Sequence, residues 1–113
     1  MPRVPPDHDE PLERHREALE RLHAAVVESS GVLPPDERAA AATRAGVPER
    51  FSSYVGAIHD HASRITDATV AELQAGGASD DEVFEITVAA AYGAARRRLD
   101  AALGAVRAAT EER

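Results

Sequence analysis

The stretch Gly76-Gly77-Ala78-Ser79-Asp80-Asp81-Glu82-Val83-Phe84-Glu85-Ile86 contains the strongest helix start in the sequence. Ser79 and Glu82 form the S-x-x-E pattern of a capping box. In that motif the Ser hydroxyl accepts a hydrogen bond from the N3 backbone N–H, and the Glu carboxylate accepts one from the N-cap N–H. Asp80 and Asp81 add negative charge at the positive end of the helix dipole. Because two glycines precede the cap, the stretch predicts the end of one helix and the start of a long one.

The predicted long helix covers residues 80–109 and carries two apolar stripes. The first stripe consists of Val83, Ile86, Thr87, Ala90 and Ala94. The second, rotated from the first by roughly 130°, consists of Phe84, Val88, Ala95, Leu99, Ala102 and Val106. The first half of the helix is therefore apolar over the wide arc of a central helix. Gly93 and Gly104 each weaken a helix by about 1 kcal/mol relative to Ala, so they indicate close helix approach or a bend.

Four shorter helices are expected before the long one, over about residues 10–28, 35–45, 49–64 and 68–75. The first has an apolar stripe at three- and four-residue spacing, made of Leu12, His15, Leu19, Leu22 and Val26. No segment alternates with a period of two residues, so no strand is expected. The sequence predicts an all-α fold: a compact bundle of about five helices in one domain over residues 9–113. Residues 1–8, with three prolines, are expected to form a disordered tail.

The composition excludes several classes of function. The net charge of −7 argues against binding to nucleic acid and to anionic membranes. Without Cys, the chain has no disulfides, thiol redox chemistry or thiolate metal sites, and without Lys it has no Schiff-base chemistry. We expect a cytoplasmic protein with no cofactor, and the Ala and Arg bias is typical of GC-rich bacterial genomes. A small, Ala-rich core favours oligomerisation.

The cluster His59-Asp60-His61 is the first candidate for chemistry. On a helix the two His residues point about 200° apart, so they do not form a chelate and no metal site is expected. His61 lies two turns after Tyr54, and this pair is the candidate for general acid–base catalysis. The alternative is a His at the edge of the core. His15 and His23 on the first helix are assigned to packing.

Arg96-Arg97-Arg98 is a basic run in an acidic protein. Arg96 and Arg97 are the candidates for binding a carboxylate or phosphate of a substrate. Consecutive helical positions fan out around the axis, so the alternative is that these side chains are simply solvated.

The run from Leu73 to Val83, followed by the Ala-rich segment to Gly93, resembles the alkylhydroperoxidase D-like (carboxymuconolactone decarboxylase) superfamily. The resemblance covers about residues 33–103. The redox members carry C-x-x-C-x-x-x-H before this turn, and the corresponding positions here are Ala62, Ile65 and Thr69. Peroxidase and disulfide-reductase activity are therefore excluded. The resemblance implies a helical fold that assembles into trimers or hexamers, or pairs with a related subunit.

The leading hypothesis is a non-redox, oligomeric helical protein that acts as an accessory or structural subunit or binds a small ligand. The alternative is an acid–base enzyme, a decarboxylase or isomerase of a small carboxylated or lactone substrate. In that enzyme His61, Tyr54 and the Arg run would converge on one cavity. A third hypothesis is a module that binds a partner through the first helix.

Overall fold

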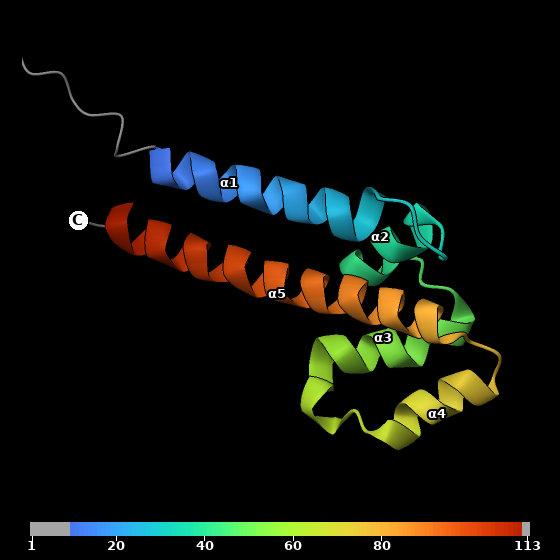
Figure 1. Ribbon diagram of the computed structural model, residues 1–113. Coiled ribbons are helices and arrows are strands. Elements are labelled where there is room, and N and C mark those ends of the chain that lie inside the picture. The colour runs from blue at the N-terminus through green and yellow to red at the C-terminus, as the bar shows by residue number, and fades with distance from the viewer. Residues whose placement is uncertain (1–9, 112–113) are drawn as a thin grey trace, which may run out of the picture.

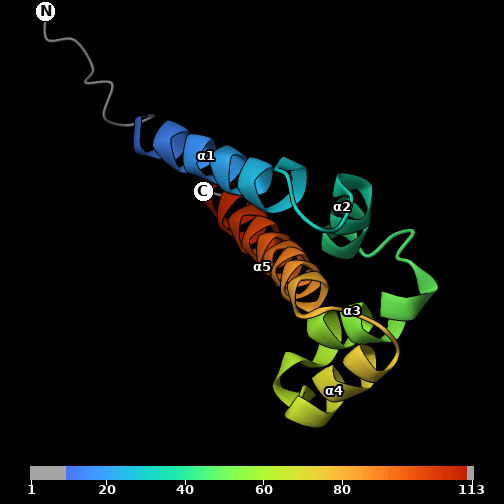
Figure 2. The ribbon, with the colours of Figure 1, turned by 45° about the vertical axis from the view of Figure 1, so that its right-hand side comes forward.

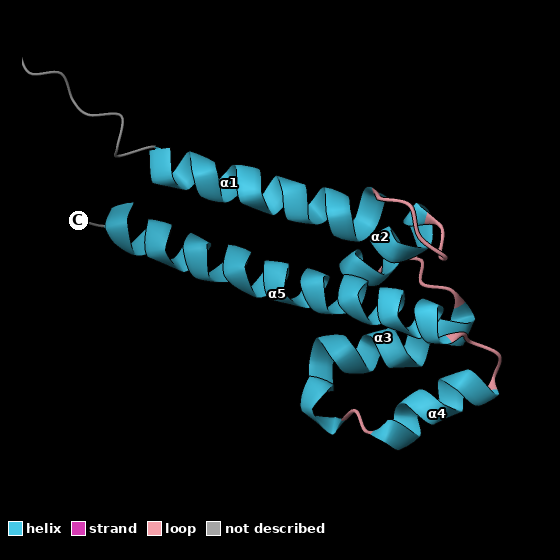
Figure 3. Ribbon diagram, in the orientation of Figure 1, coloured by secondary structure: helices cyan, strands magenta, loops and turns pink. Residues whose placement is uncertain are grey.

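The computed structural model describes residues 10–111, which form helices joined by short loops (Figures 1 and 3). The elements in chain order are α1 (Glu10–His23), η2 (Ala24–Glu28), α2 (Pro35–Thr43), α3 (Glu49–His61), η3 (Ala62–Arg64), α4 (Asp67–Ala75) and α5 (Asp80–Glu111). No strand occurs within residues 10–111, so the prediction of an all-α fold with a long C-terminal helix is confirmed. The tail predicted for residues 1–8 lies outside the described residues.

The predicted capping box at the start of α5 is formed. The N–H of Ser79 donates to Oε1 of Glu82 over 2.9 Å, and the N–H of Glu82 donates to Oγ of Ser79 over 3.1 Å. The hydrogen bonds from Ser79, first its backbone N–H, hold the pKa of Glu82 below its ordinary range. Gly77 has a φ of 111°, which an L side chain rarely adopts. The chain can therefore leave α4 and enter α5 within four residues.

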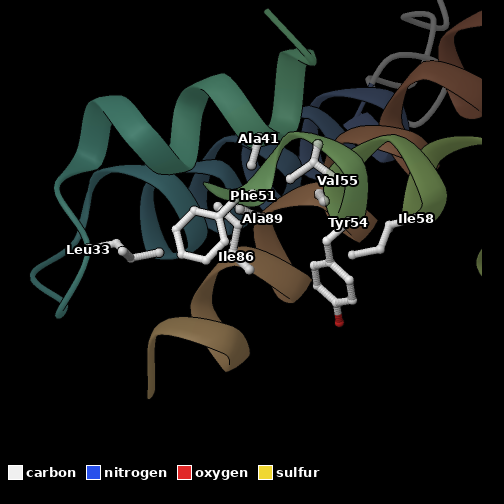
Figure 4. Packing of buried hydrophobic residues seen from close by; sticks show 9 residues of the cluster. Leu33, Ala41, Phe51, Tyr54, Val55, Ile58, Ile86 and Ala89 are labelled. Atoms are coloured by element: carbon white, nitrogen blue, oxygen red, sulfur yellow. The ribbon is translucent and has the colours of Figure 1, made fainter. Parts of the chain in front are cut away.

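The core lies where α2 and α3 pack against the first half of α5 (Figure 4). Its buried members are Leu33, Ala41, Phe51, Tyr54, Val55, Ile58, Ile86, Ala89 and Ala90. The first predicted stripe of α5 thus faces this core. Gly93 lies directly against α2, because a Cβ at this position would come within 2.5 Å of the Cα of Ala42. The predicted close approach at Gly93 is confirmed, whereas a Cβ on Gly104 would meet nothing within 4 Å.

A buried ion pair ties the loop after η2 to α2 and α5. Arg38 is only 3% exposed, and its guanidinium donates to the carbonyls of Val26 and Ser29, which lie at the end of η2. Glu85 lies 4.0 Å from Nε of Arg38 and accepts hydrogen bonds from the backbone N–H groups of Val32 and Leu33. The two charges therefore serve mainly to satisfy backbone groups that would otherwise lack partners.

The predicted third helix is shorter than expected. It ends at His61, whose backbone angles (φ −146°, ψ 48°) are not helical, and a 3₁₀ turn follows. A capping box between Thr66 and Thr69 starts α4. This local cap competes with continuation of the helix, so Ala62 becomes exposed instead of lying on the apolar face of α3.

The second half of α5 extends beyond the core, with α1 running beside it in both ribbon views (Figures 1 and 2). Ala94 is the last buried residue of α5, and residues 97–111 are all exposed. A helix of 32 residues is about 48 Å long. The core covers only its first half.

Candidate functional site

Tyr54, one of the predicted acid–base residues, is buried and held in the core. Its hydroxyl lies 2.7 Å from Oγ1 of Thr87, which itself donates to the carbonyl of Val83 over 2.6 Å. The single hydroxyl proton of Thr87 is thereby used, so Tyr54 is the donor of the pair. The ring of Tyr54 also lines a cavity of about 330 Å³ between α3 and α4. Figure 4 shows its hydroxyl pointing away from the other labelled side chains.

His61, the predicted partner of Tyr54, is exposed at the end of α3 and does not line the cavity beside Tyr54. The structure therefore does not bring His61 and Tyr54 to one cavity. The neighbouring His59 is 2% exposed, and its Nε2 donates to the carbonyl of Ala41 over 2.9 Å. His59 is thus part of the packing between α2 and α3.

Arg96 and Arg97, the predicted substrate-binding residues, lie together in a different cavity. This cavity of about 420 Å³ lies between α1, α2 and α5, and we refer to it as the Arg96 cleft. Its lining residues are His23, Ala42, Thr43, Tyr92, Gly93, Arg96, Arg97 and Asp100. Arg98 points elsewhere and donates to the carbonyl of His59. Tyr54 and the Arg pair therefore line different cavities, and His61 lines neither of them.

A chain of polar side chains crosses the Arg96 cleft. Arg96 donates to the Tyr92 hydroxyl over 3.3 Å, and that hydroxyl lies 3.0 Å from Nδ1 of His23. Nε2 of His23 lies 3.7 Å from a carboxylate oxygen of Glu28. The Tyr92 oxygen accepts from Arg96, and its own O–H donates to Nδ1 when the His23 proton lies on Nε2, toward Glu28.

The hydrogen bond to Tyr92, more than the nearby carboxylate of Asp100, raises the pKa of the Arg96 guanidinium above its ordinary value. Arg96 therefore stays charged, and it is held from two sides, because its Nε also donates to Asp100 over 3.4 Å. The cleft thus presents a fixed cation, a phenol and an imidazole to the same space. These groups can bind an anion and transfer protons.

Sequence reasoning missed His23 and Tyr92 as members of a site. His23 was assigned to packing, and the structure corrects this: its side chain is 45% exposed and hydrogen-bonded within the cleft. The two residues are 69 positions apart, so their contact depends on how α1 lies on α5. One local signal was present, because Tyr92 and Arg96 are spaced i,i+4 and therefore face the same side of a helix.

A second candidate is an apolar surface on α5, which we call the α5 stripe. It consists of Phe84, Val88, Ala91, Ala95, Leu99, Ala102 and Val106, all exposed. Phe84 is 58% exposed and Val106 is 63% exposed. The residues of the stripe, from Phe84 to Val106, are spaced three or four apart, in six steps over 22 residues. With 3.6 residues per turn, the direction of the stripe around the helix axis changes by only about 40° over this length. It is therefore a nearly straight band about 33 Å long.

Comparison with known proteins found no match: no family model, curated protein or solved structure resembles the chain. The resemblance to the alkylhydroperoxidase D-like superfamily therefore stays a prediction. Within residues 10–111, no helix has both the length and the apolar character needed to cross a membrane. In the same residues, no three His, Asp or Glu side chains lie close enough to hold a metal ion together.

Proposed function

We propose that this chain is a non-redox helical protein that assembles with further copies of itself, as an accessory or structural subunit. The observation that supports it best is the α5 stripe. Exposed apolar residues occur singly on most proteins, but a continuous band of this length indicates an interaction surface. The Ala-rich core supplies little buried area per residue, so an assembly would add to the stability of the fold.

The side chains of the α5 stripe are complementary to a second copy that runs antiparallel. With a two-fold axis at Ala95, the facing pairs are Phe84 with Val106, Val88 with Ala102, Ala91 with Leu99, and Ala95 with Ala95. Large residues then face smaller ones in the three outer layers, and two Ala residues meet at the centre. A parallel arrangement in register would set Leu99 against Leu99 and leave gaps beside the Ala pairs.

The charges of α5 favour the same direction. Its first turns are acidic, with Asp80, Asp81 and Glu82, whereas the last turns carry Arg107 and Glu111 and have no net charge. In an antiparallel pair, the acidic end of one helix lies beside the Arg107 end of the other. A parallel pair would bring like charges together. The two helix dipoles also oppose each other only in the antiparallel arrangement.

An isologous contact of this kind closes in a dimer and also fits inside a hexamer with two-fold axes. The proposal is therefore compatible with the hexamer that the superfamily resemblance implies. The chain would contribute the α5 stripe to such an assembly.

Sedimentation velocity at micromolar concentration tests the proposal. The wild-type chain is expected to sediment as an oligomer. The double variant Leu99→Glu, Val106→Glu is expected to be a folded monomer, because it places charges in the apolar contact. Ala101→Glu is the matched control, because Ala101 is exposed about 120° around α5 from the centre of the stripe and should leave assembly unchanged. A wild-type monomer at 100 µM, on the order of the affinities of weak complexes, would overturn the proposal.

The register has its own test, which uses the absence of Cys from the natural chain. Val88→Cys and Ala102→Cys are prepared as separate variants and oxidised alone and as a mixture. The antiparallel arrangement predicts a covalent dimer in the mixture only, because position 88 of one copy faces position 102 of the other. Efficient cross-linking of either variant alone would indicate the parallel arrangement.

A further inference from the structure

We propose that the Arg96 cleft is a binding site for a small carboxylate with a short apolar tail. This inference does not depend on self-assembly. It concerns a different side of α5, where α1 and α2 approach the helix.

The cleft already holds its main hydrogen-bond donors in place. Arg96 is half-buried, and its guanidinium donates to the Tyr92 hydroxyl over 3.3 Å. A planar guanidinium matches the two oxygens of a carboxylate and forms two parallel hydrogen bonds with it. Because the Arg96 side chain is held before the ligand arrives, little conformational entropy is lost on binding.

Arg97 supplies a second positive charge to the same cleft. It is exposed, and within residues 10–111 no carboxylate lies within 4.0 Å of its guanidinium. The chain as a whole carries a charge of −7, yet the lining of this cleft contains two Arg residues and only one acidic residue, Asp100. An anion is therefore attracted to the cleft in spite of the acidic protein around it.

Asp100 occupies the place that a ligand carboxylate would take. Its oxygen lies 3.4 Å from Nε of Arg96, and its side chain is 62% exposed. Such an exposed pair on adjacent turns is weak. A ligand that binds both Arg96 and Arg97 can displace Asp100, which then turns toward solvent. Asp100 also disfavours ligands with two negative charges, so a monocarboxylate fits better than a phosphate.

The wall of the cleft between the polar groups is small and apolar. It is formed by Ala42 and Gly93, at the point where α2 crosses α5. The cavity volume of about 420 Å³ is within the range of small-molecule sites. A short hydrocarbon tail would cover this wall while the carboxylate meets Arg96.

Titration calorimetry on the full chain tests this inference with butyrate, butyramide and inorganic phosphate. Butyramide has the shape of butyrate without the charge. We expect saturable binding of butyrate with a Kd of about 1 mM or below, and much weaker binding of the other two. Equal binding of butyrate and butyramide would exclude recognition of the carboxylate. Phosphate binding as tight as butyrate would overturn the assignment of the ligand class.

Two variants and one control locate the site. Arg96→Gln is expected to weaken butyrate binding by about tenfold or more. Asp100→Asn is expected to strengthen it, because the competing carboxylate is removed. Arg64→Gln removes an exposed Arg on η3, which does not line the cleft, and should have no effect. If Asp100→Asn weakens binding or leaves it unchanged, or if Arg64→Gln weakens it as much as Arg96→Gln, the cleft is not the site.

Discussion

Replacing Gly93 by Ala tests the packing that positions the cleft. The new Cβ would lie within 2.5 Å of both the Cα and the carbonyl carbon of Ala42, and still closer to its oxygen. Carbon atoms in contact are separated by about 3.5 Å or more, so α2 has to move away from α5 by about 1 Å. The obstructing atoms are backbone, which cannot turn aside as a flexible side chain would.

The cost follows from what this movement disrupts. Residues in close-packed cores lose a quarter to a half of their dispersion energy when a gap of about 0.5 to 1 Å opens. Forced overpacking costs about 1–3 kcal/mol, and a rigid backbone contact belongs at the upper end. The higher helix propensity of Ala relative to Gly stabilises the fold by about 1 kcal/mol and so offsets part of this cost. We therefore expect Gly93→Ala to lower the free energy of unfolding by about 2 kcal/mol.

Gly104→Ala is the matched control on the same helix. A Cβ at Gly104 meets nothing within 4 Å, so only the propensity gain of about 1 kcal/mol remains. Thermal unfolding followed by circular dichroism, at one protein concentration, should show Tm about 8 °C lower for Gly93→Ala and about 4 °C higher for Gly104→Ala. A Gly93→Ala chain as stable as the wild type would refute the close crossing of α2 and α5.

Four further predictions concern the fold. Ser79→Ala should lower the free energy of unfolding by about 1 kcal/mol, measured by urea titration. The pKa of Glu82 is lowered in the folded state, so its carboxylate stabilises the fold above the ordinary pKa near 4.5, and this stabilisation is lost as the pH falls through the folded-state pKa. Glu82→Gln should therefore flatten the pH dependence of Tm in this acidic range. An unchanged pH profile of Tm would contradict this. Arg38→Met should cost about 3 kcal/mol, because it removes the side-chain donor to the carbonyls of Val26 and Ser29 and leaves the Glu85 carboxylate without its cation. Arg50→Met, at a pair that is 54% exposed on the Arg side, should cost less than about 1 kcal/mol, and similar losses would be inconsistent with the burial of Arg38. Tyr54→Phe should cost about 1 kcal/mol in a urea titration, for one lost hydrogen bond, and a loss above about 3 kcal/mol would point to a further role.

The features that the sequence predicted well depend on local interactions. The capping box joins Ser79 and Glu82 within one helical turn, and the buried stripe of α5 follows from helical periodicity alone. The end of α3 at His61 was missed because nothing in the apolar pattern marks it. The apolar spacing of the predicted third helix continues to Ile65, past the end of α3. The competing signal is polar and local: the capping box at Thr66, which starts α4.

The Arg96 cleft shows why site prediction was harder than fold prediction. Tyr92 and Arg96 share a helix face, and that relation is visible in the sequence. Their contact with His23 requires α1 to lie on α5, and the buried pair of Arg38 and Glu85 helps to fix that placement through the loop after η2. Helical spacing paired Tyr54 with His61, whereas the Tyr–His contact in the structure joins Tyr92 on α5 to His23 on α1.

The length of α5 connects the two proposals. Its last buried residue is Ala94, so the part that carries Leu99 and Val106 does not contribute to the core of its own chain. Short isolated helices are marginal in water, and the residues of the α5 stripe stay exposed although α1 lies beside this segment. A second copy on the stripe would give the segment a packed partner. It would also hold the turn that carries Arg96, since Ala95 lies on the stripe one residue before it. We therefore infer that assembly and ligand binding, although separable by their variants, stabilise the same part of α5.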